Sequence, residues 1–313
     1  MKYQNKSIAR ASFRRCLGLY RRYFSEVGYL PRFFNYHYSA YRHRAAIYKR
    51  RALVSALPLT ESGKNLLAKL QADGGAKTSF DELQIDNSVL SLLQNQMQER
   101  GEQSAETIKN SRKGQSKTYW TSVVDSTHAA YPALTEFATH PALLSVIAHY
   151  LGQVPLLLNI HFYYSPPALP SPELIGSQGW HLDNEQRTKI KLFLSPHEMT
   201  AENGPTTFLP LPYSDPKKYK NYPNYFDDVQ ARAFGIDISK RVEMLAEPGE
   251  FYLADTSRLF HYGARNQMRS RWLVILDYGP LENNLWPGKW QKYDGPGSPH
   301  VLENQKIIKQ FGG

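Results

Sequence analysis

The spacing of hydrophobic positions divides the chain into a helical first third and a β-rich remainder. Apolar residues recur at helical spacing over residues 52–72 and 81–100. They do so again over residues 134–150, where Pro141 fits a first-turn position and Gly152 fits a helix end. Residues 101–117 are polar and rich in Lys, Ser, Gln and Gly, which predicts a surface loop.

Short strands follow from residue 154 onward. Residues 154–164 form an apolar run typical of a buried strand, and residues 188–195 alternate so that Lys189 and Lys191 share one polar, wet face. Further strands are expected at residues 118–124, 206–209, 250–254 and 271–278. This order predicts a mainly β fold with flanking helices, a sandwich or jelly-roll barrel that carries helices on one side.

The composition limits the chemistry. Of the 313 residues, 41% are hydrophobic and 21% are charged, which suits one globular catalytic domain. Cys16 is the only cysteine, so a disulfide framework, a cysteine zinc site and a protein-held iron–sulfur cluster are excluded. No apolar run approaches the roughly 20 residues that cross a bilayer, and no secretory signal is present, so we expect a cytoplasmic protein.

The net charge of +10 belongs to the N-terminal segment, because residues 1–51 hold thirteen Lys and Arg against Glu26 alone. Phe13, Leu17, Tyr20 and Phe24 line one face of a helix in this segment, and arginines line another. Such a basic amphipathic helix predicts peripheral contact with an anionic membrane, here the inner face. Packing against the catalytic body and an organellar targeting peptide are the alternatives, and nucleic acid is an unlikely partner.

The strongest chemical signal is Trp180-His181-Leu182-Asp183, followed eighty residues later by His261. Residues two apart on a strand point to the same side, so His181 and Asp183 can hold one ion together while Leu182 points away. Two histidines and one carboxylate form the ligand set that binds ferrous iron and leaves its other positions open. We therefore expect His181, Asp183 and His261 to be metal ligands.

Residues 139–278 resemble the phytanoyl-CoA hydroxylase type of Fe(II)/2-oxoglutarate-dependent dioxygenase. The resemblance rests on five segments in the family's order: His140-Pro141-Ala142-Leu143-Leu144 through Leu151-Gly152, the His181 motif, Asn203-Gly204-Pro205, Pro248-Gly249-Glu250, and His261 with Asn266 and Arg271. It implies a double-stranded β-helix of the jelly-roll or cupin-like kind, with Fe(II), 2-oxoglutarate and O2 as cofactor and co-substrates.

The same resemblance implies that an arginine about ten residues beyond His261 binds the far carboxylate of 2-oxoglutarate. Arg271 opens a strand and is the first choice, with Arg269 as the fallback. Family members often carry a lysine where this chain has Ser165, so we expect Tyr163, Tyr164 or Asn159 to supply a second contact. The resemblance also implies hydroxylation rather than halogenation, because Asp183 fills the position that related halogenases leave to halide.

These predictions divide the chain into a basic arm at 1–51, a helical segment with a polar loop at 52–117, the dioxygenase core at 118–280 and an extension at 281–313. The charge pattern favours an anionic, membrane-associated substrate. Among similar enzymes, those that hydroxylate Kdo, the acidic sugar of lipid A and lipopolysaccharide, fit best. An acyl-CoA, a fatty acid or a small metabolite is the alternative. A non-catalytic membrane or nucleic-acid adaptor and a cupin with non-oxidative metal chemistry stay open as different classes.

Overall fold

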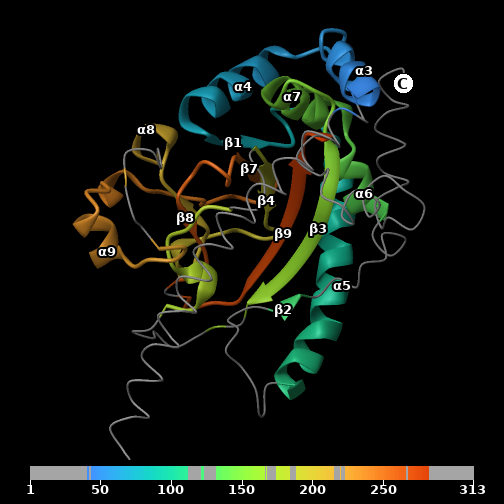
Figure 1. Ribbon diagram of the computed structural model, residues 1–313. Helices are drawn as coiled ribbons and strands as arrows, with labels where there is room; N and C mark the ends of the chain where they lie inside the picture. Colours follow the sequence, from blue (N-terminus) through green and yellow to red (C-terminus); the bar gives the residue numbers. More distant parts are fainter. Residues whose placement is uncertain are drawn as a thin grey trace, which may run out of the picture.

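The chain folds around two antiparallel β-sheets of unequal size, with helices against the larger one (Figure 1). The computed structural model describes residues 41, 44–111, 121–122, 132–165, 167, 174–183, 188–214, 219, 223–265 and 267–281. Most of the basic arm expected at residues 1–51, and all of the C-terminal extension except Leu281, lie outside the described residues.

The larger sheet has six strands and the smaller sheet three. In spatial order the larger sheet contains β1 (Gly75–Ser79), β7 (Glu250–Ala254), β4 (Ile190–Leu194), β9 (Arg271–Gly279), β3 (Leu156–Ser165) and β2 (Thr121–Ser122). The smaller sheet contains β6 (Val242–Glu243), β5 (Thr207–Phe208) and β8 (His261–Tyr262). A single antiparallel bridge between His181 and His261 adds the segment around Trp180 to the edge of the smaller sheet.

The path of the chain between the sheets defines the fold. From β3 onward it runs to the His181 segment in the smaller sheet, back to β4, across to β5 and β6, back to β7, across to β8 and back to β9. This alternation of antiparallel segments is the path of a double-stranded β-helix. The predicted mainly β jelly-roll with flanking helices is confirmed.

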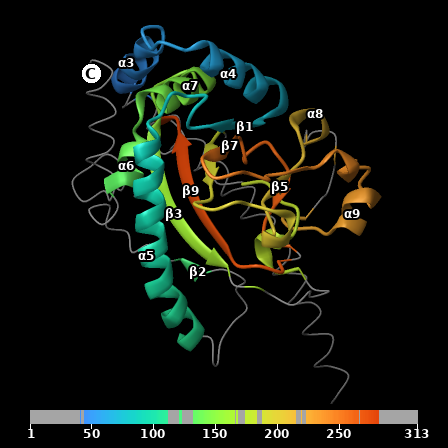
Figure 2. The same cartoon turned by 180° about the vertical axis from the view of Figure 1, so that it is seen from behind.

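Among the described residues, five helices precede or interrupt the strands on the side of the larger sheet, and two short ones accompany the smaller sheet. The first group contains α3 (Arg44–Val54), α4 (Glu61–Asp73), α5 (Asn87–Ser111), α6 (Pro132–Ala138) and α7 (Pro141–Leu151). The second contains α8 (Leu211–Ser214) and α9 (Asp228–Ala233), with single 3-10 turns at Gly176–Gln178, Ala201–Asn203 and Ile238–Lys240. Figures 1 and 2 show α5, α6 and α7 beside the larger sheet and α8 and α9 on the opposite side of the molecule.

Alternation along β4 decides which residues meet the helices. Ile190, Leu192 and Leu194 are fully buried in the core between the larger sheet and the helices. Phe193, of the opposite parity, packs instead in the core between the two sheets. The face that the sequence predicted to be wet therefore points into the barrel, where Lys189 is buried and Lys191 is mostly covered.

Local sequence signals explain where the helices start and stop. Thr60 caps α4 by accepting a hydrogen bond from the Gly63 amide, and Gly152 ends α7 in the left-handed region at φ 70°. The predicted helix over 52–72 is in fact two helices, since Pro58 and the Thr60 cap separate α3 from α4.

Two sequence expectations in the first third were wrong. The polar segment from residue 101, expected to be a loop, continues α5 as far as Ser111, because its Gln, Glu, Ala and Lys residues are good helix formers. Strand β1 was not expected from Gly75–Ser79, and it forms because β7 supplies its antiparallel partner.

Helix α3 crosses the boundary that the charge pattern suggested at residue 51. Ile47 and Arg50 are buried, and Arg50 donates hydrogen bonds to the carbonyl oxygens of Val154 and Pro155, at 3.2 and 3.1 Å, just before β3. Arg50 therefore belongs to the folded body and not to a solvated basic arm.

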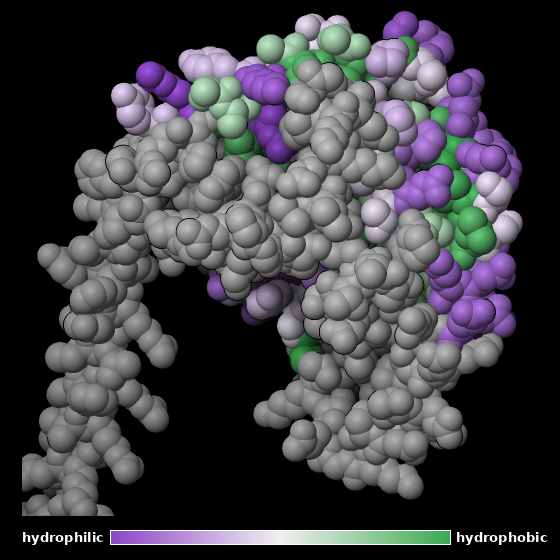
Figure 3. Space-filling view, turned by 90° about the vertical axis from the view of Figure 1, so that its right-hand side faces the viewer, coloured by the Kyte–Doolittle hydropathy of each residue, from purple (hydrophilic) through white to green (hydrophobic). Residues whose placement is uncertain are grey.

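The outer surface of the helical layer is mixed. On the face shown in Figure 3, hydrophilic residues cover much of the coloured surface and hydrophobic ones form small groups between them. None of the helices among the described residues combines the length and the apolar composition that crossing a bilayer requires.

Three phenylalanines join the helices to the larger sheet. Phe80 and Phe137 stack with ring centroids 4.7 Å apart, and both meet Phe251 edge-on at 5.8 and 5.4 Å. All three are buried, so this cluster fixes α6 against β7.

We predict that Phe137→Ala lowers the free energy of unfolding by about 3–5 kcal/mol, because the cavity that it leaves cannot collapse in the middle of the cluster. The matched control is Leu92→Ala, at an exposed position of α5, which we expect to cost less than about 1 kcal/mol. Chemical denaturation of both variants measures the difference. Equal losses would contradict the central role of the cluster.

Candidate metal centre and its cavity

The backbone bridge between His181 and His261 brings the two imidazoles together. Each residue donates its amide to the carbonyl oxygen of the other, both at 3.0 Å, and the ring centroids lie 4.1 Å apart. Trp180 and Tyr262, the neighbours of the two histidines, also pack edge to face at 4.5 Å. Two histidines that are eighty positions apart in the sequence thus have adjacent side chains.

Both rings are oriented by a carbonyl group two residues earlier. The Nδ1 of His181 lies 2.9 Å from the Gly179 oxygen, and the Nδ1 of His261 lies 2.9 Å from the Leu259 oxygen. A carbonyl oxygen only accepts, so each Nδ1 carries the proton and each Nε2 keeps its lone pair. Lone pairs on Nε2, with Nδ1 held by a backbone oxygen, are what a metal-binding histidine pair requires.

Asp183 completes the group with one oxygen held and the other directed at the histidines. Its Oδ2 accepts hydrogen bonds from the Thr256 hydroxyl and from the Lys191 ammonium, the latter at 2.6 Å. Its Oδ1 lies 3.9 Å from the Nε2 of His261. One ligand atom from each of His181, Asp183 and His261 falls within 4.8 Å of the other two.

The electrostatics suit a divalent cation. Burial, and then the neighbouring His181, lower the pKa of His261 to about 3, and burial lowers the pKa of His181 as well. Both rings are therefore neutral near pH 7, the state in which imidazole binds metals. Burial favours the neutral acid of Asp183, but Lys191, His261 and Lys189 outweigh it, so the pKa of Asp183 lies well below its ordinary value. The site offers two neutral nitrogens and one carboxylate.

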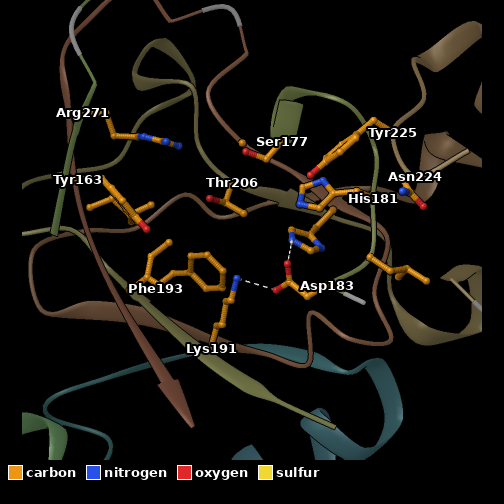
Figure 4. A pocket seen from close by; sticks show the side chains of 15 residues that line it. Tyr163, Ser177, His181, Asp183, Lys191, Phe193, Thr206, Asn224, Tyr225 and Arg271 are labelled. Carbon is orange, nitrogen blue, oxygen red and sulfur yellow. Dashed lines mark ion pairs between the residues drawn. The ribbon is translucent and has the colours of Figure 1, made fainter. Parts of the chain in front are cut away.

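These three side chains open into a cavity of about 530 Å³ between the two sheets. In Figure 4, Arg271 enters the cavity from the side opposite His181 and Asp183, and Thr206 and Ser177 lie between them. Leu273, Ile275 and Phe193 provide an apolar wall. The volume suits a small organic acid bound next to a metal.

The two arginines that the sequence suggested as ligands of 2-oxoglutarate lie in different environments. Arg271 is 5% exposed, lines the cavity, and donates a hydrogen bond to the Gly204 oxygen at 2.8 Å. Arg269 is 67% exposed and pairs with Glu202 at 2.7 Å on the surface. Only Arg271 is in position to bind a ligand in the cavity.

Of the three residues expected to give a second contact, Tyr163 lines the cavity, and Tyr164 and Asn159 do not belong to its lining. The side-chain amide of Asn159 instead donates to Asp277 at 3.2 Å. Tyr164 packs its ring on Trp272, with centroids 4.3 Å apart. Asn266, from the same family motif, lies outside the described residues.

Sequence reasoning missed several residues around the cavity. Lys191 was placed on a wet face and, with Lys189, counted toward an anionic target, but it was not assigned to the site, although its parity with Phe193 was the available signal. Tyr225, whose ring centroid lies 5.2 Å from that of His181, and Asn224 come from an irregular segment that gave no signal.

A second group of missed residues holds the His181 segment from behind. Asp228 accepts hydrogen bonds from the Trp180 indole and from Arg265, both at 2.7 Å. The Arg265 guanidinium also lies 3.6 Å from the centre of the Tyr262 ring. This arrangement ties α9 to both strands that carry the histidines.

No protein-family model matches this chain, and no curated protein matches it either.

Three solved structures illustrate what its fold is similar to. EctD from S. alaskensis with bound Fe is 17% identical, with a TM-score of 0.49, over 74% of this chain and 84% of that chain. The carbocyclase SnoK from nogalamycin biosynthesis is 14% identical, with a TM-score of 0.49, over 71% of this chain and 86% of that chain. The epimerase SnoN in complex with Fe3+, alpha ketoglutarate and nogalamycin RO is 14% identical, with a TM-score of 0.46, over 70% of this chain and 84% of that chain. Likeness at this level shows no activity for the present chain.

We predict that divalent iron, or Mn(II) as an air-stable substitute, stabilises the wild-type protein through this triad. At free metal about 100 times the dissociation constant, the gain is about 2.7 kcal/mol, seen as a rise in Tm. His261→Ala and Asp183→Ala should abolish the rise, since each removes one ligand. His197→Ala, at an exposed histidine, is the matched control and should keep it. A metal-dependent rise that survives in both triad variants would place the ion elsewhere.

Proposed function

We propose that this chain is a non-haem Fe(II)- and 2-oxoglutarate-dependent dioxygenase that hydroxylates an unactivated carbon of an anionic substrate. One observation supports this most directly. A neutral histidine pair and an ionised carboxylate lie in the same cavity as a buried arginine on the opposite wall.

The ligand set favours ferrous iron. Two neutral imidazoles and one carboxylate, arranged on one side of an ion, leave further positions for a chelating acid and for dioxygen. His181, Asp183 and His261 would hold the metal through Nε2, Oδ1 and Nε2, because the other polar atoms of these side chains already have partners. When bound, iron supplies the activation of dioxygen that no side chain of this cavity can provide.

The arginine favours a co-substrate with a second acidic end. Arg271 presents a buried guanidinium whose planar fork matches a carboxylate. Thr206, whose side chain carries a hydroxyl, belongs to the same cavity lining as Arg271. A dicarboxylic keto acid can thus span the cavity, with its keto-acid end at the metal and its far carboxylate on Arg271.

Asp183 supports hydroxylation over halogenation, because its carboxylate occupies the position that a halide would need. The cupin alternative with non-oxidative chemistry would have no use for a buried arginine across from the metal. A non-catalytic adaptor would have no use for a triad whose three ligand atoms lie within 4.8 Å of one another.

We predict that wild-type protein with Fe(II) and O2 converts 2-oxoglutarate to succinate, and that Arg271→Ala raises the KM for 2-oxoglutarate by about 30-fold or more. The reason is that removing one partner of a buried charge pair costs on the order of 2 kcal/mol or more. Arg269→Ala is the matched control, since an exposed pair contributes little, and its KM should change less than about twofold. Equal effects of the two substitutions, or no succinate at all, would contradict the proposal.

For the substrate we propose the acidic sugar Kdo of lipid A or lipopolysaccharide, with an acyl-CoA, a fatty acid or a small metabolite as alternatives. The support is the charge of residues 1–51, which carry thirteen basic residues and one acidic residue. We assign the basic residues other than Arg50, which is buried in the folded body, to a peripheral contact with the inner, anionic face of the membrane. Residues 1–43 precede α3, so their removal leaves the buried Ile47 and Arg50 in place.

We predict that cells expressing the enzyme show a gain of one oxygen atom in a Kdo-containing glycolipid by mass spectrometry, and that Asp183→Ala abolishes it. Removing residues 1–43 should reduce this product, because the membrane contact would be lost, while succinate formation from a soluble substrate stays. A product mass shift confined to fatty acids or soluble metabolites would assign the substrate to one of the alternatives.

A further inference from the structure

Lys191 is a second buried cation of the cavity that neither the metal nor the far carboxylate of the co-substrate requires. We propose that its ammonium binds an anionic group of the substrate, such as a carboxylate, beside the metal. This inference rests on the function proposed above and assigns a residue to the anionic character of the substrate.

Lys191 and Arg271 enter the cavity from different ends of the larger sheet. Lys191 on β4 pairs with Asp277 on β9, six residues beyond Arg271, which corresponds to roughly 20 Å along a strand. Figure 4 shows the two cations on opposite sides, with Tyr163 and Phe193 between them. Lys191 is therefore placed for an anionic group at the Asp183 end of the cavity, where its ammonium lies 2.6 Å from that carboxylate, and not for the group that Arg271 would bind on the other side.

The immediate surroundings of Lys191 make its charge effective. Its side chain is 16% exposed and lies beside the apolar Phe193 and Ile275 in the cavity lining. An ammonium has three N–H donors, and among the described residues Asp183 is the one group that Lys191 contacts within hydrogen-bond distance.

Lys191 is not needed to orient Asp183. The Thr256 hydroxyl donates to the same Oδ2, and the Asp183 amide donates to the Thr256 carbonyl oxygen at 2.9 Å. These two hydrogen bonds with Thr256 hold Asp183 in place without Lys191. A metal ion bound to Oδ1 would also offset the negative charge of Asp183 and so weaken the attraction between Asp183 and Lys191.

The charges of the cavity favour an anion in addition to the co-substrate. In the protein alone, Lys189 and Lys191 are balanced by Asp277 and Asp183, with Lys189 3.1 Å from Asp277 and 4.0 Å from Asp183. Behind His181, Arg265 and Asp228 cancel each other at 2.7 Å.

A bound Fe(II) adds two positive charges and Arg271 adds one, whereas 2-oxoglutarate brings two negative charges. Counted over the described residues, this sum leaves one positive charge in the cavity. Since an uncompensated buried charge is costly, a substrate with an anionic group next to Lys191 completes the balance.

The test measures the preference for acids over their neutral esters. Protein loaded anaerobically with Fe(II) and 2-oxoglutarate is titrated by calorimetry with Kdo, octanoate and acetate, and with the methyl ester of each. We expect wild type to bind at least one acid about tenfold more tightly than its ester, the size of one charge-assisted hydrogen bond. In Lys191→Met the ratio falls to about one, and in Lys191→Arg it is kept. The matched control is Lys77→Met on β1, whose lysine pairs with Glu250 at 2.9 Å outside the cavity lining.

Iron content and the affinity for 2-oxoglutarate are measured on the same samples. The acid-to-ester ratio is compared only between samples of equal iron content, because Lys191 also donates to the ligand Asp183, so that a general loss of metal in Lys191→Met is not mistaken for a lost acid preference. An acid preference that persists in Lys191→Met, or that is absent from wild type, overturns the inference, and the wild-type comparison needs no variant to fold. A tenfold weaker affinity for 2-oxoglutarate in Lys191→Met also overturns it, by assigning Lys191 to the co-substrate. Failure of wild type to bind 2-oxoglutarate is a separate result, because it removes the proposed function itself.

Discussion

The antiparallel backbone bridge between His181 and His261 is the constraint on which the candidate site depends. Its two hydrogen bonds bring the imidazoles close together, and the carbonyl oxygens of Gly179 and Leu259 hold the Nδ1 atoms of both rings, which leaves both Nε2 atoms for a metal. Asp183 joins them because it follows His181 by two residues in an extended segment. The ligand set therefore exists only when the smaller sheet is closed, so metal binding and closure of the barrel stabilise each other.

The inside of the barrel combines this rigid frame with an unusual number of charges. Lys189, Asp277, Lys191 and Asp183 form a chain of ion pairs that is largely withdrawn from water. Apolar side chains in these positions would make a protein of similar or greater stability, since the desolvation cost of buried pairs rivals their attraction. Such charges make physical sense in a cavity that receives a cation and several anions. The apolar wall of Phe193, Leu273 and Ile275 keeps the space around them poor in water and so strengthens their interactions.

The sequence was sufficient to predict the triad, because the rule that alternate strand residues share a side is local and His181 is the only histidine followed by an acid two residues later. The sequence also ranked Arg271, which opens β9, ahead of Arg269, and the structure places Arg271 in the cavity lining and Arg269 on the surface. Hydrophobic spacing located α4, α7 and the first part of α5 before β3, and β4, β5, β7 and β9 after it, but gave no sign of β6.

Other features could not be predicted because they depend on distant partners. The polar face of β4 was taken as wet, since alternation shows that a face is polar but not whether solvent or a cavity lies beside it. Asp228 and Arg265 contact Trp180 from α9 and from the loop after β8, and nothing local relates these three positions. The full length of α5 depended on helix propensity in a segment whose polar composition suggested a loop.

The most direct test of the account is the visible absorption of the protein under anaerobic conditions as 2-oxoglutarate is added to its ferrous form. If Fe(II) is held by His181, Asp183 and His261 with open positions facing Arg271, a weak charge-transfer band of the chelated keto acid appears and saturates with 2-oxoglutarate. A ferrous protein that binds iron but gives no such band would contradict the account, since the metal would then serve a chemistry that does not involve this co-substrate.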